Sequence, residues 1–221
     1  MRKIKLDVPF NTTQSADKIE FASLFPGEAD LFSNATGYRL KISEAYSYKA
    51  LPAAYKKYID SNPMLQNDLS FPMAFLNETE WNLEARTADS SSADLYQKVV
   101  NNYATETWAI WNGTDDAHPI HIHLNRFRIL GRQKADAAGK PLAGVENFLL
   151  PEPNEMGWKD VVRAKPGYIT YLLHQYILND NLQDGQFLYH CHILEHEDMS
   201  MMRRLVIKAG DAAAKFVISS Y

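Results

Sequence analysis

The stretch YHCHILEHEDMSM, residues 189–201, decides the interpretation of this chain. It holds the only cysteine of the 221-residue sequence and three of its seven histidines. Three further histidines lie in a second short window, HPIHIH, at residues 118–123. Because the two windows are far apart in the sequence, we expect the fold to bring two strands together around a metal site.

The first window combines donor groups that suit copper. A lone thiolate, imidazoles and a thioether favour a copper ion that cycles between its two oxidation states. Cys191, His196 and Met201 supply one of each within a short segment. Zinc is the main alternative because cysteine and histidine also bind it, but the thioether argues for copper.

Strand geometry divides the histidines between two faces. If residues 186–192 form a strand, neighbouring side chains alternate, so His190 and His192 share one face and Cys191 points to the other. The second window follows the same rule, and the turn at its proline separates its first histidine from the other two: His118, then His121 and His123. This arrangement predicts one mononuclear thiolate copper and, behind it, a cysteine-free group of imidazoles. A cupin site is the alternative for the second window, but the glutamate it needs downstream is missing.

The two windows together resemble the copper signature of the multicopper oxidases, and most of all the bacterial laccase, spore-coat oxidase and bilirubin oxidase group. The likeness runs from about Ala104 to Ile207 and includes GWKD at residues 157–160 and PG at residues 166–167. The resemblance implies an all-β fold, a cupredoxin-like Greek-key β-sandwich, here with a helical or loop insertion near the N-terminus. It also implies copper as the cofactor.

The resemblance further implies a role for each residue of the windows. The implied ligands are His118, Cys191, His196 and the weak axial Met201 for a type 1 copper, His121 for a type 2 copper, and His123, His190 and His192 for a type 3 pair. Glu197 matches an acidic residue that helps to move protons to the oxygen site. Glu197 and Cys191 are therefore the residues expected to act in catalysis.

One departure from the family pattern concerns the trinuclear cluster, which needs eight histidines, half of them from an N-terminal domain. No histidine precedes His118. The chain therefore resembles only the C-terminal domain of such an oxidase, with a complete type 1 site and half of a trinuclear site. The expected partners are N-terminal cupredoxin domains on a separate chain or fragment, or further copies in an oligomer.

Two functions follow from this resemblance. In the first, a small-molecule reductant (a phenol, an aryl amine or a metal ion) gives electrons to the type 1 copper. The electrons pass through Cys191 and its neighbours His190 and His192 to the trinuclear centre, where O2 is reduced to water. In the second, the chain is a stand-alone type 1 copper protein that binds copper or transfers electrons without oxygen chemistry.

Composition excludes several other classes. A hydrophobic fraction of 46% is enough for a core, and a net charge of −4 gives no basic footprint for nucleic acid. No apolar run reaches the ~18 residues of a membrane helix. The charged start lacks the apolar region of a secretory signal, so none is expected and the compartment stays open. Four Asn-x-Ser/Thr sequons, which we attribute to chance, begin at Asn11, Asn34, Asn77 and Asn112.

The chain is expected to form a single domain over residues 1–221. Its expected parts are a first strand at 1–8, an insertion or wrapping arm at 9–70, and the core sandwich at 71–221. Residues 9–37 are expected to be loop. Residues 43–59 have the spacing of a helix that Pro52 must start, kink or split, and the helix is expected to pack the tyrosines Tyr46, Tyr55 and Tyr58 on the sheet.

Within the core sandwich, alternating or apolar runs predict strands at 71–76, 105–111, 161–164, 168–176, 186–192 and 203–207. Residues 124–130 are expected to continue the strand of the 118–123 window, because Phe127 and Ile129 keep the alternation of its histidines. Residues 90–92 read as a turn and 131–157 as a long excursion. His174 has no motif around it and is expected to be structural.

Overall fold

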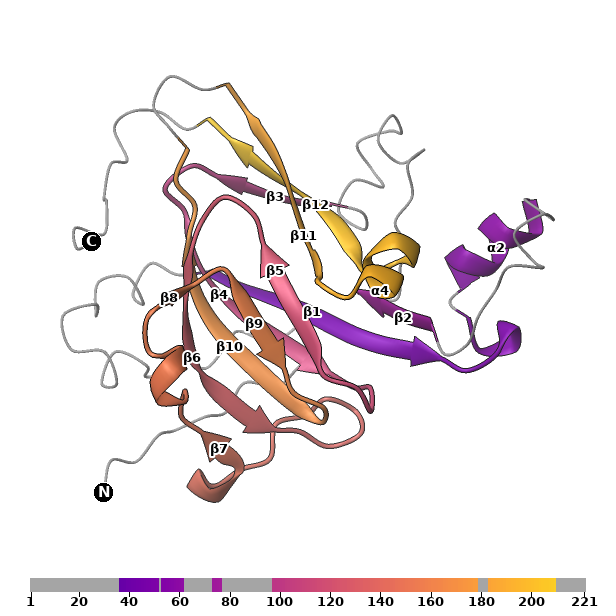
Figure 1. The fold of residues 1–221 in the computed structure, drawn as a ribbon, viewed down its shortest axis with the longest axis horizontal. Helices are drawn as coiled ribbons and strands as arrows, with labels where there is room; N and C mark the ends of the chain where they lie inside the picture. Colours follow the sequence, from indigo (N-terminus) through magenta and orange to yellow (C-terminus); the bar gives the residue numbers. More distant parts are fainter. Residues whose placement is uncertain (1–35, 52, 62–72, 77–96, 179–182, 210–221) are drawn as a thin grey trace.

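The computed structural model describes residues 36–51, 53–61, 73–76, 97–178 and 183–209, and these residues form mainly strands (Figure 1). One sheet contains β1 (Thr36–Ala45), β2 (Met73–Leu76), β4 (Thr105–Asn112), β6 (Phe127–Lys134), β7 (Phe148–Leu149), β8 (Trp158–Lys159) and β10 (Tyr168–Gln175). The other contains β3 (Gln97–Asn101), β5 (His118–Ile122), β9 (Val161–Ala164), β11 (Gly185–Cys191) and β12 (Met202–Lys208). The helical elements are η2 (Tyr48–Ala50), α2 (Ala53–Ser61), η5 (Val145–Asn147), η6 (Pro153–Glu155) and α4 (Leu194–Met199).

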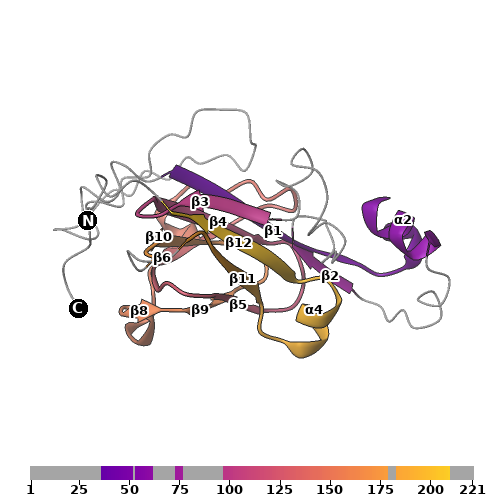
Figure 2. The ribbon, with the colours of Figure 1, turned by 90° about the horizontal axis from the view of Figure 1, so that it is seen from above.

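The two sheets define an all-β sandwich, as expected from the sequence. The larger sheet has the order β2-β1-β4-β10-β6-β7, with β8 paired to β6, and the smaller has the order β3-β12-β11-β5-β9. Pairing is antiparallel except for β1 with β4 and β12 with β3. Figures 1 and 2 both show α4 beside β11 and β12, whereas α2 lies beyond the end of β1, where its Ile59 belongs to a small buried cluster with Met73 and Phe75 of β2.

The main core lies between the sheets and draws side chains from both, as alternation along each strand requires. Fully buried members from the larger sheet are Leu40, Ile42, Trp108, Ile110 and Leu172, and from the smaller sheet Ile120, Ile122, Cys191, Leu205 and Ile207. Cys191 therefore faces the core, and its two histidine neighbours leave on the other side of β11.

The N-terminal part of the chain differs from expectation. Residues 36–45 are not loop or insertion, because β1 lies inside the larger sheet between β2 and β4. Its alternate residues Leu40 and Ile42 are fully buried, so the strand belongs to the sandwich. Of the alternatives left open for residues 43–59, the structure has the helix starting after Pro52, because α2 begins at Ala53 and a proline disfavours helix before it. Tyr46 is exposed rather than packed on the sheet.

The prediction that residues 124–130 continue the strand of the 118–123 window is also wrong. The chain leaves β5 at Ile122, turns through residues 123–126, and enters the opposite sheet as β6 at Phe127. Leu124 takes a positive φ of 73° in this turn. The alternation persists only because the residues at 127 and 129 face the same core from the other side.

The remaining strand predictions agree with the structure in β2, β4, β9, β10, β11 and β12. The excursion at 131–157 begins later than expected, because β6 runs to Lys134, and it contains the short strand β7. The predicted strand at 1–8 and turn at 90–92 lie outside the described residues. Among the described residues, no helix is long and apolar enough to cross a membrane.

Candidate metal centre

The two histidine windows lie side by side, because β5 and β11 are antiparallel neighbours in the smaller sheet. Their register pairs His190 with His121 and Cys191 with Ile120. Two further backbone hydrogen bonds hold the end of β11: Cys191 N donates to Met201 O at 2.9 Å, and His192 N donates to Pro119 O at 2.7 Å. Segments some 70 residues apart thus lie side by side in the interior of the smaller sheet.

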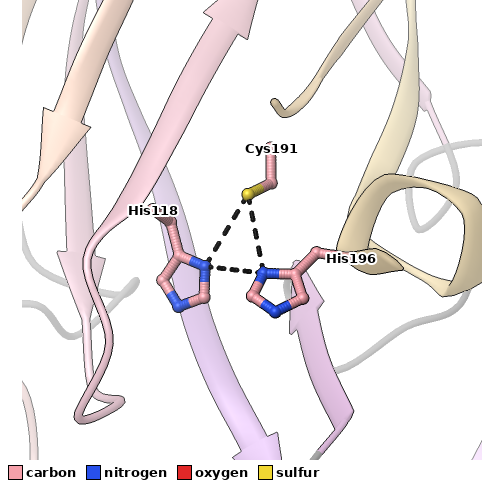
Figure 3. A group of neighbouring side chains, drawn as sticks. All are labelled: His118, Cys191 and His196. Atoms are coloured by element: carbon pink, nitrogen blue, oxygen red, sulfur yellow. Dashed lines mark hydrogen bonds between the residues drawn. The ribbon is translucent and has the colours of Figure 1, made fainter. Parts of the chain in front are cut away.

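His118, Cys191 and His196 form a first cluster on the core side of β5 and β11 (Figure 3). Cys191 Sγ lies 3.7 Å from Nδ1 of His118 and 3.7 Å from Nδ1 of His196, and the two nitrogens are 3.2 Å apart. A point equidistant from the three atoms is about 2.1 Å from each, close to ordinary metal–ligand distances. The donor set and its spacing therefore fit a metal ion with two imidazoles and one thiolate.

Burial shapes the chemistry of this first cluster. His118 and Cys191 are fully buried, whereas His196 is partly exposed on α4. Burial, helped by the neighbouring His196, lowers the pKa of His118 to about 4, although Asp116 opposes this. Burial also raises the pKa of Cys191 to about 11. His118 is thus neutral and ready to act as a ligand, whereas the buried thiolate requires a cation beside it.

Met201 returns to the same place at the end of α4. It is fully buried in the core that contains Cys191, accepts the backbone bond from that cysteine, and donates its own N–H to His196 O at 2.8 Å. The short helix therefore closes a loop between β11 and β12 that brings Met201 beside the first cluster through its backbone.

A second cluster forms on the outer side of β5 and β11. Nitrogens of His121, His123 and His190 lie within 4.8 Å of one another, and Nε2 of His123 is 3.1 Å from Nε2 of His190. His192 joins the group, with its ring centre 5.8 Å from that of His121 and 5.5 Å from that of His190. Four imidazoles on one face and the thiol on the other is the arrangement that strand alternation predicts.

Hydrogen bonds orient the rings of this second cluster. Nδ1 of His121 lies 2.8 Å from the Asp160 carbonyl oxygen, and Nδ1 of His190 lies 2.9 Å from the Cys191 carbonyl oxygen. Because a carbonyl only accepts, each Nδ1 carries a hydrogen, and Nε2 is the nitrogen of each ring left to act as a ligand atom. Burial, followed by the neighbouring histidines, lowers the pKa of His123, so positive charge is disfavoured here.

Glu197 also lies at this second cluster. Its Oε2 is 2.7 Å from Nδ1 of His190, and both side chains are largely buried. Glu197 therefore contacts His190 on the outer side of β11, whereas Cys191, the other predicted catalytic residue, faces the core. Glu197 lies behind a ring of the cluster rather than among the nitrogens that face each other.

Sequence reasoning missed the groups that hold the rings. The Asp160 carbonyl is a backbone group, so the GWKD element at residues 157–160 marks its place in the family pattern but not its contact with His121. Asn112 and Thr114 lie beside His118, and their only signal was the sequon that we attributed to chance. Both are buried in the fold.

Comparison with known proteins shows the family of this chain. The family model described as multicopper oxidase matches residues 61–211. The chain therefore belongs to the multicopper oxidase family, and membership implies copper as the cofactor.

Two curated relatives are laccases. That of Bacillus subtilis (strain 168) is 33% identical over 146 residues, which are 64% of this chain and 26% of that protein. That of Haloferax volcanii is 40% identical over 105 residues, which are 48% of this chain and 16% of that protein. The chain thus spans no more than about a quarter of the length of these relatives.

Solved structures support the cupredoxin-like fold. McoA, a multicopper oxidase from Aquifex aeolicus, matches with a TM-score of 0.51 and 22% identity over 79% of this chain and 30% of that one. A multicopper oxidase from Campylobacter jejuni, described as a metallo-oxidase, matches with a TM-score of 0.51 and 22% identity over 78% of this chain and 30% of that one.

Proposed function

We propose that this chain is the C-terminal copper-binding domain or subunit of a laccase-like multicopper oxidase. In this proposal it oxidises a phenol, an aryl amine or a metal ion at a type 1 copper and passes the electrons to a trinuclear copper site that reduces O2 to water. The observation that carries the proposal is the pair of clusters on opposite faces of β11, joined by the bond between His190 and Cys191.

The first cluster is the proposed type 1 site. His118, Cys191 and His196 would hold the ion, with Met201 as the weak axial ligand. Copper bound there would supply one-electron redox chemistry, which the soft thiolate favours. His118 and Cys191 exclude water from the inner side of the site, while the partly exposed His196 turns toward solvent, where a reductant can approach.

The chain itself offers a short route between the clusters. The sulfur of Cys191 connects through its own backbone to its carbonyl oxygen, which accepts the hydrogen bond from His190 Nδ1 at 2.9 Å. The covalent path along the peptide bond to His190 runs beside it, and His192 follows on the other side. These connections support electron transfer from the thiolate side to the imidazole side of β11.

The second cluster is the proposed half of the trinuclear site. In this assignment His121 is a type 2 ligand, and His123, His190 and His192 are type 3 ligands. The exposed His192 and the partly exposed His121 and His123 favour a site that another surface completes. We propose that N-terminal cupredoxin domains, on another chain or fragment or in an oligomer, bring the remaining histidines.

Glu197 is the proposed proton relay of this site. Its carboxylate lies against Nδ1 of His190 and is itself shielded from solvent, so it can hold a proton close to the imidazole cluster. The alternative role, as an orienting group for the His190 ring, involves the same contact. A Glu197→Gln change separates the two, because it keeps the shape and hydrogen-bonding capacity but removes the acid. Loss of turnover with unchanged copper content favours the relay.

Copper content and oxygen consumption test the proposal on one sample. The isolated chain should bind one copper with intense thiolate-to-copper absorption and consume no O2. Addition of a fragment with the N-terminal cupredoxin domains should raise the copper content and start O2 consumption. A blue chain that stays inactive with the fragment would favour the alternative, a stand-alone type 1 copper protein. A chain whose copper shows no thiolate absorption would contradict both.

A further inference from the structure

The ring of His118 is held from behind by a hydroxyl group. Its Nε2 lies 2.8 Å from Thr114 Oγ1, while its Nδ1 faces Cys191 Sγ at 3.7 Å. The imidazole is fully buried, and Thr114 is 5% exposed. The two nitrogens of this ring therefore have separate partners, one in the first cluster and one outside it.

The direction of the hydrogen bond between the two residues follows from the other contacts of Thr114. A threonine hydroxyl has one hydrogen to donate. Thr114 Oγ1 lies 2.7 Å from Asn112 Oδ1 and 3.1 Å from the Asp116 carbonyl oxygen, and both of these atoms only accept. The single hydrogen is used there, so the oxygen accepts from His118. Nε2 of His118 thus carries the hydrogen, and Nδ1 keeps its lone pair toward the cluster.

Asn112 cannot rotate to change this pattern. Its Nδ2 donates to the carbonyl oxygens of Asp116 at 2.7 Å and Ala164 at 2.9 Å, while its Oδ1 also accepts from Thr114 N at 3.0 Å. An amide turned by 180° would point its oxygen at two carbonyl oxygens. Ala164 on β9 is also the register partner of His118 on β5, so the strand pair that carries the histidine also fixes the amide.

We propose that Thr114, fixed by Asn112, is a positioning residue that selects the Nδ1 ligand atom of His118. This inference rests on the proposed type 1 site. The hydrogen bonds of Thr114 go to Asn112, Asp116 and His118, so within the first cluster it acts through the His118 ring. Without its acceptor oxygen the buried Nε2–H has no partner, and the form with hydrogen on Nδ1, which cannot bind a metal through that atom, gains population.

The test compares threonine variants of the full 221-residue chain. Thr114→Val keeps the shape and removes the acceptor, whereas Thr114→Ser restores the hydroxyl. Titration with Cu2+, followed by the thiolate-to-copper absorption, should show affinity lowered roughly 10- to 100-fold in Thr114→Val and near the wild-type value in Thr114→Ser. Thr170→Val is the matched control, because Thr170 is also buried but its hydroxyl has no hydrogen-bond partner among the described residues.

Thermal unfolding of the metal-free variants shows whether each one folds. A folded Thr114→Val chain with wild-type copper affinity and absorption would overturn the proposal. If that variant does not fold, the wild-type chain still decides the matter through 15N NMR of labelled histidine, with the His118 signal assigned by its loss in His118→Gln. We expect the hydrogen of His118 on Nε2, and a hydrogen on Nδ1 would overturn the proposal. Copper that binds without thiolate absorption would instead remove the type 1 site and leave this NMR result unaffected.

Discussion

Replacing His174 with leucine should make the fold less sensitive to acid. His174 lies in β10, fully buried among the rings of Trp108, Phe127 and Tyr176. Neither of its ring nitrogens has a hydrogen-bond partner among the described residues. Burial lowers the pKa of this imidazole to about 3. The sequence suggested a structural histidine, and the structure gives that histidine a measurable effect on stability.

Proton linkage gives the direction and the size of the change in unfolding free energy with pH. Between the folded pKa of about 3 and the unfolded value of 6.5, only the unfolded chain binds the proton, so the free energy of unfolding falls as the pH drops below 6.5. At pH 5 this one residue lowers it by about 2 kcal/mol, and at pH 7.5 by almost nothing. His118, whose pKa is also lowered, adds a loss of the same sign in both wild type and variant.

Urea unfolding of the metal-free chain at pH 7.5 and pH 5.0 measures the effect. The loss of unfolding free energy between the two pH values should be about 2 kcal/mol smaller in His174→Leu than in wild type. Comparing the two pH values cancels any packing change caused by the substitution. Leu172→Val, a change without a titrating group on the same strand, should lower stability equally at both. An unchanged acid response in His174→Leu would refute the reasoning, since it would mean that the native state binds the same proton.

Three further changes test other parts of the chain. Cys191→Ser should abolish the visible thiolate-to-copper absorption and turnover, because oxygen cannot replace the soft sulfur, and a retained colour would contradict the ligand assignment. Met201→Leu should keep the colour and raise the reduction potential in a redox titration, and an unchanged potential would argue against an axial contact. Glu155→Ala should cost about 3 kcal/mol in urea unfolding, because it leaves Arg132, 4% exposed and bonded to it at 2.6 and 2.8 Å, without its carboxylate. The double change to methionine at both positions should recover most of that loss, and a double variant as weak as the single one would count against the buried pair.

The histidine windows could be predicted from the sequence because two physical rules agree there. Donor chemistry groups Cys191 with two imidazoles, and the alternation of a strand separates it from His190. The apolar residues Ile120 and Ile122 mark the inner face of β5, so the position of that face was also readable. Both clusters follow from these local rules once β5 and β11 are paired, and the family resemblance supplied that pairing.

The parts that failed depend on contacts that no local pattern contains. β1 carries its buried residues at positions 40 and 42 among polar neighbours, and its place is fixed by parallel pairing with β4, more than 60 residues away. The sequence pattern did not predict the crossing from β5 to β6, because alternation shows which face a side chain takes and not which sheet its strand joins. The hydrogen-bonded group of Asn112 and Thr114 behind His118 was missed for a similar reason, because the bond that ties Asn112 to the neighbouring strand goes to a carbonyl 52 residues away.

The two clusters differ in what fixes their rings, and this difference locates the weak point of the domain. Nδ1 of His121 and Nδ1 of His190 each have a backbone carbonyl oxygen as partner, which substitution of a side chain leaves in place, although Nδ1 of His190 also contacts the Glu197 carboxylate. His118 uses the opposite nitrogen and depends on one hydroxyl that a single substitution can delete. Copper binding at the first cluster should therefore be more sensitive to changes outside the ligand set than metal binding at the second. Of the two residues behind the His118 ring, Thr114 should have the larger effect on copper binding, because Asn112 reaches the ring only through Thr114.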